Sequence, residues 1–292
     1  MSLKKYEAFL KTVELGSLTK ASEVLGYTQS GISHMLSALE EECGVRLLFR
    51  DRAGVRLTSD GRILLPYIRS VCNENRTFLE KINEIKGVKA GVIRIGAFTS
   101  VSVQWLPDII KSFRNEYPNI EFELRYGDYA DIEKWIEQGM VDCGFTRMPV
   151  SSSIKTYFLK KDKLVVILPE DHEYASLDSF PVSALSKFPY IRLDEGTDYE
   201  ITAIFDKYKI RPNVQFTARD DYAIIAMTAS GLGISILPEL VLKNTSYPVV
   251  KKELDIKASR DLCVAVRTED MSAATKSFLK HTVEWARKEH LK

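Results

Sequence analysis

The chain contains little histidine and little cysteine, and both are dispersed. There are four of each in 292 residues, and no C-x-x-C pair or histidine spacing would build a tetrahedral metal site. Cys43, Cys72, Cys143 and Cys263 fit small hydrophobic positions better than a redox site, which needs clustered ligands or an activated thiolate. We therefore expect neither a metal nor another cofactor.

Signatures of common enzyme classes are also missing. The sequence has no G-x-S-x-G, H-E-x-x-H or G-x-x-x-x-G-K-[ST] segment. Residues 31–35 begin like a nucleophile elbow but lack its second glycine, and residues 231–233 lack the third glycine of a dinucleotide-binding turn. We expect no catalytic residue, and an enzyme is the weaker alternative.

Long apolar runs are absent too. None approaches the roughly 18 residues of a membrane helix, and residues 1–7 are not followed by the apolar stretch of a secretory signal. A soluble, cytoplasmic protein without membrane contact is expected, whereas an exported solute-binding protein, the second alternative, would need such a signal. The formal net charge is only +1, so any surface that binds nucleic acid must be local.

Three helices are predicted at the N-terminal end. Apolar residues recur at helical spacing over residues 3–15. Ser17 and Thr28 are placed to cap a second and a third helix, which Gly26 and Gly44 would end.

The polar face of the third helix is predicted to read DNA. Its apolar residues fall on one stripe, which leaves short polar side chains on the opposite face. Such groups donate and accept at close range to base edges in a major groove about 12 Å wide. Glu40–Glu42 come only at the far end, where they would repel phosphate and point the N-terminal half into the groove. The predicted contacts from this helix are Thr28, Gln29, Ser30, Ser33, His34 and Ser37.

A hairpin is predicted after the third helix. Residues 45–50 and 55–58 alternate as two short strands around a turn at 51–54, which is typical of a wing. Cations on such a hairpin contact phosphate or the minor groove. Arg50, Arg52 and Arg56 therefore join the predicted DNA contacts, although any one alone could be a solvated surface arginine.

Residues 58–86 are predicted to form one long helix. A stripe of apolar side chains along it favours a partner helix, so we interpret it as a dimerising linker. The alternative is an amphipathic helix that packs on its own domain. A dimer would place two recognition helices on successive turns of DNA, roughly 34 Å apart. The stripe consists of Leu64, Tyr67, Val71, Phe78, Ile82 and Ile85.

Motifs over about the first 65 residues strongly resemble those of the LysR-type transcriptional regulators. They are GSLTKASEVL at 16–25, TQSGISH at 28–34, LEEECGVRLL at 39–48 and LTSDG at 57–61. The resemblance continues weakly along the chain. It departs at Ser30, where the family often has proline, and at His34, where it often has arginine and where base preference could differ.

The resemblance implies a homodimer or homotetramer with an effector domain shaped like a periplasmic binding protein. It also implies control of double-stranded promoter DNA in response to a small metabolite. The effector is left open between a small organic acid and an amino acid. RNA polymerase is a further candidate partner.

Beyond a linker at 86–91, apolar strands alternate with helices, as in an α/β domain. Crossovers near Asp162 and near Cys263 would join two lobes with a cleft between them. The predicted strands are 92–97, 120–125, 141–145, 163–168, 190–193, 214–217 and 262–266.

Ligands of open α/β sheets bind beyond the carboxyl ends of strands, near helix N-termini. Four turns satisfy that rule, at 98–102, 146–147, 194–197 and 217–219. For each hydroxyl the alternative is helix capping. Arg147 or Arg219 could bind a carboxylate or simply pair with an acidic side chain. The family resemblance implies that Thr99, Ser100, Thr146 and Thr197 line the effector site, and the turns add Ser102, Arg147 and Thr217 to the predicted effector-binding residues.

The predicted fold class is α + α/β. A winged helix-turn-helix occupies 1–58, a linker and dimerisation helix 59–86, and a two-lobed, periplasmic-binding-protein-like α/β effector domain 91–292. Lobe I would comprise 91–161 and 267–292, and lobe II 162–266.

Overall fold

The computed structural model describes residues 2–51, 54–85, 91–194, 199–267 and 271–290. The chain forms two compact units, residues 1–88 and 89–292. Each has its own hydrophobic core. Arg52 and Thr197, both predicted to contact a ligand, lie outside the described residues. None of the described helices is long and apolar enough to cross a membrane.

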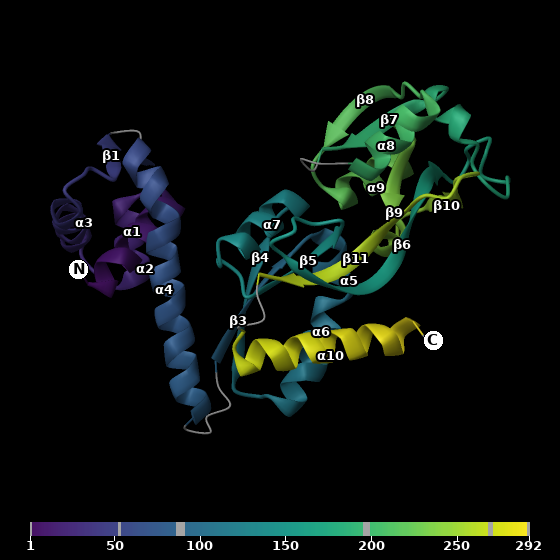
Figure 1. The fold of residues 1–292 in the computed structure, drawn as a ribbon. Coiled ribbons are helices and arrows are strands. Elements are labelled where there is room, and N and C mark those ends of the chain that lie inside the picture. Colours follow the sequence, from purple (N-terminus) through teal and green to yellow (C-terminus); the bar gives the residue numbers. More distant parts are fainter. Residues whose placement is uncertain (1, 52–53, 86–90, 195–198, 268–270, 291–292) are drawn as a thin grey trace. The chain divides into compact units, whose positions relative to one another are not determined.

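The first unit is a winged helix-turn-helix followed by one long helix, as predicted. Ser17 Oγ accepts the N–H of Lys20 at 3.3 Å, and Thr28 Oγ1 accepts that of Gly31 at 3.1 Å, so both predicted caps form. The elements are α1 (Leu3–Leu15), α2 (Leu18–Leu25), α3 (Gln29–Cys43), β1 (Leu48–Asp51), β2 (Gly54–Leu57) and α4 (Ser59–Ile85) (Figure 1).

The core of this unit fixes the orientation of α3. Phe9 of α1 packs with Ile32, Leu36 and Leu39 of α3, all of them fully or almost fully buried. The hairpin joins α4 through a tight corner, where a Cβ on Gly61 would lie 2.1 Å from the carbonyl oxygen of Leu47. Only glycine allows this approach, which accounts for the LTSDG motif at the start of α4.

The second unit alternates strands and helices through two lobes. The first lobe, as named here, contains β3 (Gly91–Ala97), α5 (Thr99–Gln104), α6 (Leu106–Glu116), β4 (Ile120–Tyr126), α7 (Tyr129–Glu137), β5 (Cys143–Met148) and α10 (Ala273–His290). The second lobe contains β7 (Pro189–Leu193), α8 (Tyr199–Tyr208), β8 (Asn213–Ala218), α9 (Asp221–Ala229), β9 (Ser235–Pro238), β10 (Val249–Glu253) and the short 3₁₀ helices η1 (Val182–Ser186) and η2 (Glu239–Leu242).

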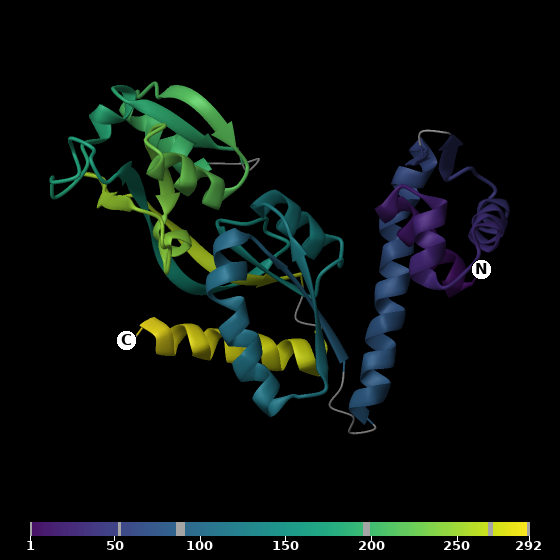
Figure 2. The ribbon, with the colours of Figure 1, turned by 180° about the vertical axis from the view of Figure 1, so that it is seen from behind.

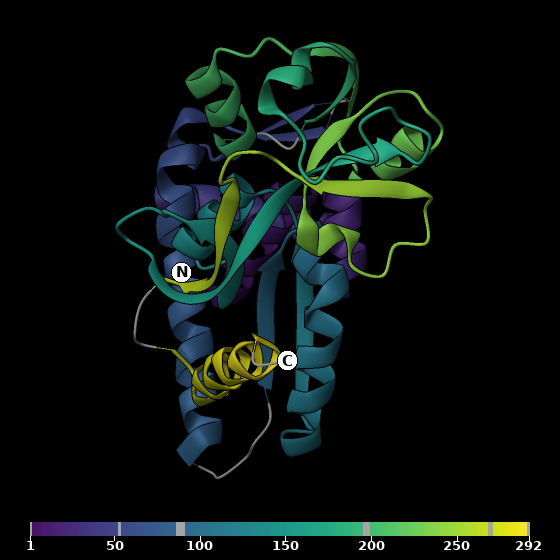
Figure 3. The ribbon, with the colours of Figure 1, turned by 90° about the vertical axis from the view of Figure 1, so that its right-hand side faces the viewer.

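Two long antiparallel strands, β6 (Lys155–Pro169) and β11 (Ser259–Val266), run between the lobes (Figures 1 and 3). The larger sheet has the order β10-β6-β11-β5-β3-β4 with β9 also on β6, and β7 pairs with β8 in a separate sheet. Leu164–Leu168 of β6 are buried consecutively, because alternate residues enter two different clusters of the second lobe.

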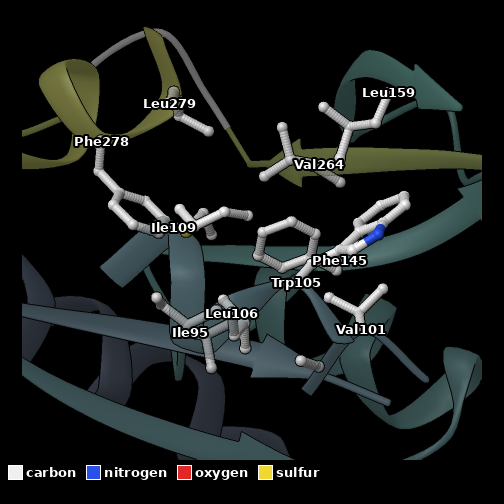
Figure 4. Packing of buried hydrophobic residues seen from close by; sticks show 14 of the residues in the cluster. Ile95, Val101, Trp105, Leu106, Ile109, Phe145, Leu159, Val264, Phe278 and Leu279 are labelled. Atoms are coloured by element: carbon white, nitrogen blue, oxygen red, sulfur yellow. The ribbon is translucent and has the colours of Figure 1, made fainter. Parts of the chain in front are cut away.

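Helices cover both faces of the first-lobe sheet. On one face α7 packs closely over Gly144, where a Cβ would lie 2.6 Å from Ile132. On the other face α6 lies beside α10 (Figure 2). Between them and the sheet, Trp105 and Ile109 pack with Phe145 of β5 and Phe278 of α10 (Figure 4).

Three sequence expectations for the second unit are wrong in detail. The strand expected at 163–168 begins at Lys155, because its first half pairs with β11 in the first lobe. Residues 99–102 are already helical, and Thr146 and Arg147 end β5 instead of forming a turn. Residues 261–265 pair with β5, so the second crossover lies near Arg260, opposite Asp162, and not at Cys263.

Candidate DNA-reading surface and effector cleft

The polar face of α3 lies on the surface of the first unit. Thr28, Gln29, Ser30, His34 and Ser37 are exposed. Ser33 is half-buried. The apolar stripe on the opposite side is packed in the core, which leaves this face free to meet a groove.

Arg50 of the hairpin lies against this face. Its Nη2 donates to Glu40 Oε2 at 2.8 Å, and its Nη1 donates to Ser33 Oγ at 3.4 Å and Ser37 Oγ at 3.3 Å. Glu40 Oε1 in turn accepts the backbone N–H groups of Leu47 and Leu48. The strand expected to start at Val45 begins instead at Leu48, as β1, and the two bonds to Glu40 hold the segment that enters it.

Arg56 occupies the outer side of the hairpin. Its Nη2 pairs with Asp51 Oδ2 at 2.6 Å, and its side chain is 71% exposed. Exposed pairs of this kind contribute little stability, so phosphate can replace Asp51 at small cost. Of the two predicted wing arginines that the structure describes, Arg56 lies on the outside of the hairpin and Arg50 over α3.

One side of α4 carries exposed apolar side chains. Ile68 is buried in the core of the unit and Leu64 packs against that core. Tyr67 (67% exposed), Phe78 (62%) and Ile85 (86%) lie on another side. Of the predicted stripe, Leu64 therefore packs on the core of its own unit, whereas Tyr67, Phe78 and Ile85 are exposed.

A small cavity lies between the lobes of the second unit. Phe98, Ser100 and Tyr129 line it from the first lobe, Glu200 and Asp221 from the second, and Arg260 from β11. Its volume of about 30 Å³ has room for about two water molecules. The lobes are closed on each other.

Arg260 organises the cavity floor. Its Nε donates to Asp162 Oδ2 at 2.9 Å, its Nη2 to Ser100 Oγ at 2.8 Å and its Nη1 to the Tyr129 hydroxyl at 2.5 Å. Burial opposes the charge, but Tyr129 and Asp162 hold the pKa of Arg260 above its ordinary value. This network fixes the point where both long strands pass between the lobes.

Two further contacts join the lobes. Arg147 Nε of β5 pairs with Glu200 Oε1 of α8 at 2.9 Å, and the guanidinium lies 5.0 Å from the centroid of the Tyr129 ring. Thr99 forms a side-chain hydrogen bond with Asp221. Burial raises the pKa of the Asp221 carboxyl, whereas Arg260 and Thr99 lower it.

The other predicted effector residues lie apart from the cavity. Among those that the structure describes, only Ser100 is in the lining, with Thr99 and Arg147 bonded to lining residues. Thr146 is fully buried, Ser102 is half-buried, and Thr217 is exposed on β8. Arg219, the alternative carboxylate binder, pairs with Asp194 at 3.3 Å.

Sequence reasoning missed the polar lining residues Tyr129, Glu200, Asp221 and Arg260, and also Asp162, which pairs with Arg260. A signal existed for one pair. Asp162 and Arg260 each stand two positions before a strongly apolar run, with Lys163 and Asp261 between, and a charge that enters such a buried strand needs a partner.

The cysteines and the described acidic and histidine side chains form no metal-ligand group of three. All four cysteines are free, and burial raises the pKa of Cys72 to about 11 and that of Cys263 to about 12. These thiols are therefore not activated as thiolates.

Comparison with known proteins gives matches along the whole chain. A family model for the bacterial regulatory helix-turn-helix protein, LysR family, matches residues 3–62, and one for the LysR substrate binding domain matches residues 86–287. YvbU, an uncharacterized HTH-type transcriptional regulator of Bacillus subtilis, is 33% identical over 292 residues, covering 97% of this chain and 98% of its own length.

Solved structures of LysR family regulators also match nearly the whole chain. HinK, a LysR family transcriptional regulator from Pseudomonas aeruginosa, gives a TM-score of 0.61 at 26% identity, covering 98% of each chain. Full-length CbnR in complex with its target DNA gives a TM-score of 0.70 at 19% identity, covering 98% of this chain and 100% of its own, which shows the shared fold.

The family consists of regulators and not of enzymes. Full-length relatives match this chain from end to end. The match covers the helix-turn-helix with its hairpin, the long helix and the two-lobed α/β unit. The chain belongs to the LysR family of bacterial DNA-binding transcription regulators, with a substrate-binding (effector) domain.

Proposed function

We propose that this regulator reads promoter DNA with the polar face of α3 and changes promoter activity when a small metabolite enters the cleft between its lobes. The observation that carries the proposal is the exposed row of uncharged polar side chains on α3, held against a hairpin by Arg50. Such groups suit base edges, and the wing arginines suit phosphate.

Specific DNA contacts are assigned to Thr28, Gln29, Ser30, Ser33, His34 and Ser37. Arg56 is assigned to phosphate because its carboxylate partner is exposed and exchangeable. Arg52 stays in the set on sequence grounds alone. Arg50 acts mainly through the serines that it contacts.

A second copy of the chain is the proposed partner of the apolar side of α4. Tyr67 and Phe78 lie about three helical turns apart and Phe78 and Ile85 about two, so the three side chains share one side of α4 that a partner helix can cover. A homodimer accounts for this face, and a homotetramer is the alternative. The proposal places the regulator in the cytoplasm with its promoter, where RNA polymerase is a further partner.

Effector entry requires the lobes to separate. A cavity of about 30 Å³ is too small for an organic acid or an amino acid, both of which stay open as effector classes. Opening would break the Arg147–Glu200 ion pair and the Thr99–Asp221 hydrogen bond. A metabolite that binds the open form more tightly than the closed form would shift the protein toward the open form, and this shift would change promoter activity.

The proposed division of the chain keeps the DNA-binding domain at 1–58, the linker helix at 59–86 and the effector domain at 91–292. The pairing of residues 261–265 with β5 supports ending lobe II near Arg260 in place of Val266.

Gel retardation of the regulator's own upstream region, across rising salt, tests DNA reading. We expect a shifted band whose affinity falls steeply with salt. Ser33→Ala and His34→Ala should weaken specific binding only, whereas Arg56→Ala should weaken specific and nonspecific binding alike and flatten the salt slope. If Ser33→Ala and His34→Ala bind the specific DNA as tightly as wild type, the assignment of α3 as the reading helix is refuted.

A further inference from the structure

Arg50 determines how two serines of α3 present their hydroxyl groups. One atom, Nη1, donates to Ser33 Oγ at 3.4 Å and to Ser37 Oγ at 3.3 Å. The two serines lie one helical turn apart on the polar face. A residue of the hairpin is thus part of the surface that α3 offers to DNA.

Glu40 holds Arg50 in this position. Its Oε2 accepts from Arg50 Nη2 at 2.8 Å, while its Oε1 accepts from the backbone of Leu47 at 2.8 Å and Leu48 at 3.0 Å. The Arg50 and Glu40 side chains are only 24% and 17% exposed. The guanidinium cannot turn away from the serines without losing a charge-assisted bond.

The polarity of both hydroxyls follows from this contact. A serine hydroxyl has one hydrogen and two lone pairs, whereas a guanidinium has donors only. Each Oγ therefore turns a lone pair toward Arg50 and its hydrogen away from the positive charge. The side of each hydroxyl that faces away from Arg50 carries the hydrogen and the remaining lone pair, and the nearby positive charge favours donation from it.

We propose that Ser33 and Ser37 recognise hydrogen-bond acceptors on base edges, and that Arg50, held by Glu40, is the positioning residue that gives them this polarity. In the major groove these acceptors are N7 of purines, O6 of guanine and O4 of thymine, whereas N4 of cytosine and N6 of adenine are donors. This inference rests on the proposed function, in which α3 is the reading helix.

Atom-by-atom replacement in the operator tests the serines. The operator is first selected from random duplexes with the full chain. Each purine is then replaced by its 7-deaza analogue, guanine by 2-aminopurine to remove O6, and thymine by 5-methyl-2-pyrimidinone to remove O4. Fluorescence anisotropy measures affinity for wild type, Ser33→Ala and Ser37→Ala.

We expect at least one acceptor deletion for each serine to weaken wild-type binding about two- to tenfold, the usual effect of one hydrogen bond. The same deletion should have no further effect on the matching alanine variant. Ser183→Ala is the matched control, because Ser183 is an exposed serine of η1 in the second unit and no DNA contact is assigned to it. It should keep the full loss.

Glu40→Gln tests the positioning role. Glutamine Oε1 can still accept the N–H groups of Leu47 and Leu48, but its amide nitrogen cannot accept from Arg50. The variant should fold, bind nonspecific duplex as wild type does, and lose discrimination between the intact operator and the acceptor-deleted one. Arg56→Ala should lower both affinities and leave their ratio unchanged.

Three outcomes separate the possibilities. If an acceptor deletion weakens the serine variants as much as wild type, the polarity assignment is wrong. It is also wrong if the serines couple instead to removal of the adenine N6 amino group, with purine in place of adenine. If every α3 variant binds the operator like wild type, the proposed function itself fails.

Discussion

Arg147 at the end of β5 and Glu200 at the start of α8 form an ion pair across the effector cleft, with Nε and Oε1 2.9 Å apart. The two side chains are 9% and 20% exposed, so solvent screens the pair only partly. Because the adjoining cavity has room for only about two waters, this contact stabilises a closed form of the cleft.

Glu200→Gln is expected to weaken the closed form. Loss of the charge should lower the free energy of unfolding by about 1–3 kcal/mol, between the values for exposed and buried pairs. It should also raise hydrogen exchange at the start of α8. Urea unfolding and exchange mass spectrometry measure both effects. Glu239→Gln is the control, since its pair with Lys251 is exposed (58% and 41%) and should change stability little. Equal effects for the two variants would argue against a role of the Arg147–Glu200 ion pair in holding the lobes together.

Thr99→Val should leave DNA binding intact and blunt the effector response. The variant keeps the shape of the side chain but removes the hydroxyl that contacts the Tyr126 hydroxyl at 2.7 Å and Asp221. Thr217→Val, on the exposed part of β8, is expected to respond like wild type. A reporter promoter and gel retardation check the two variants. An unaffected response in Thr99→Val would remove that residue from the site.

Stability should fall on the acid side of neutrality through His172. Burial lowers the pKa of this imidazole, against the opposing effect of Glu173 and Asp171, while Phe188 and Tyr174 pack around it. Below about pH 6.5 the imidazole of the unfolded chain binds a proton, whereas the buried imidazole of the folded chain stays neutral until the pH falls to its lower pKa. The free energy of unfolding that is present above about pH 6.5 is therefore lost as the pH falls through the folded pKa.

His172→Phe should reduce this loss. Urea midpoints measured between pH 7.5 and 5 should change less than in wild type, although His281, whose pKa burial also lowers, keeps part of the dependence. Identical pH slopes in the two proteins would show that His172 does not contribute.

Tyr67→Glu should weaken self-association. A charge on the exposed apolar side of α4 would have to be desolvated in a helix pair, at a cost well above that of a surface substitution. Sedimentation velocity should show a larger monomer fraction. Tyr27→Glu puts the same charge on an exposed tyrosine outside α4 and should have no effect. A dimer that survives Tyr67→Glu unchanged would place the interface elsewhere.

The sequence predicted the first unit well because its signals are local. Ser17, Thr28 and the glycines that end α1–α3 act within one helical turn, and apolar spacing identified the start of α4 to within a residue. The effector domain was predicted as alternating strands and helices, but its long strand β6 was cut short. The apolar run at 164–168 marks only the part of β6 that is buried in the second lobe.

The cleft was predicted least well. Strand ends located its neighbourhood, and Ser100 does line it. Thr146 does not, because the strand continues past it and leaves its side chain fully buried. The rule about strand ends says where a ligand can bind but not which side chains lie there.

Residue order and spacing by themselves determined the winged helix-turn-helix, the long helix, the α/β character of the remainder and the family. Tertiary structure alone decided that Arg50 lies over Ser33 and Ser37, and that Arg260 meets Asp162, 98 positions away in the chain. The physical reason is that caps and apolar periods act between near neighbours, whereas charges in a core take whichever partner the packed strands bring within hydrogen-bonding distance.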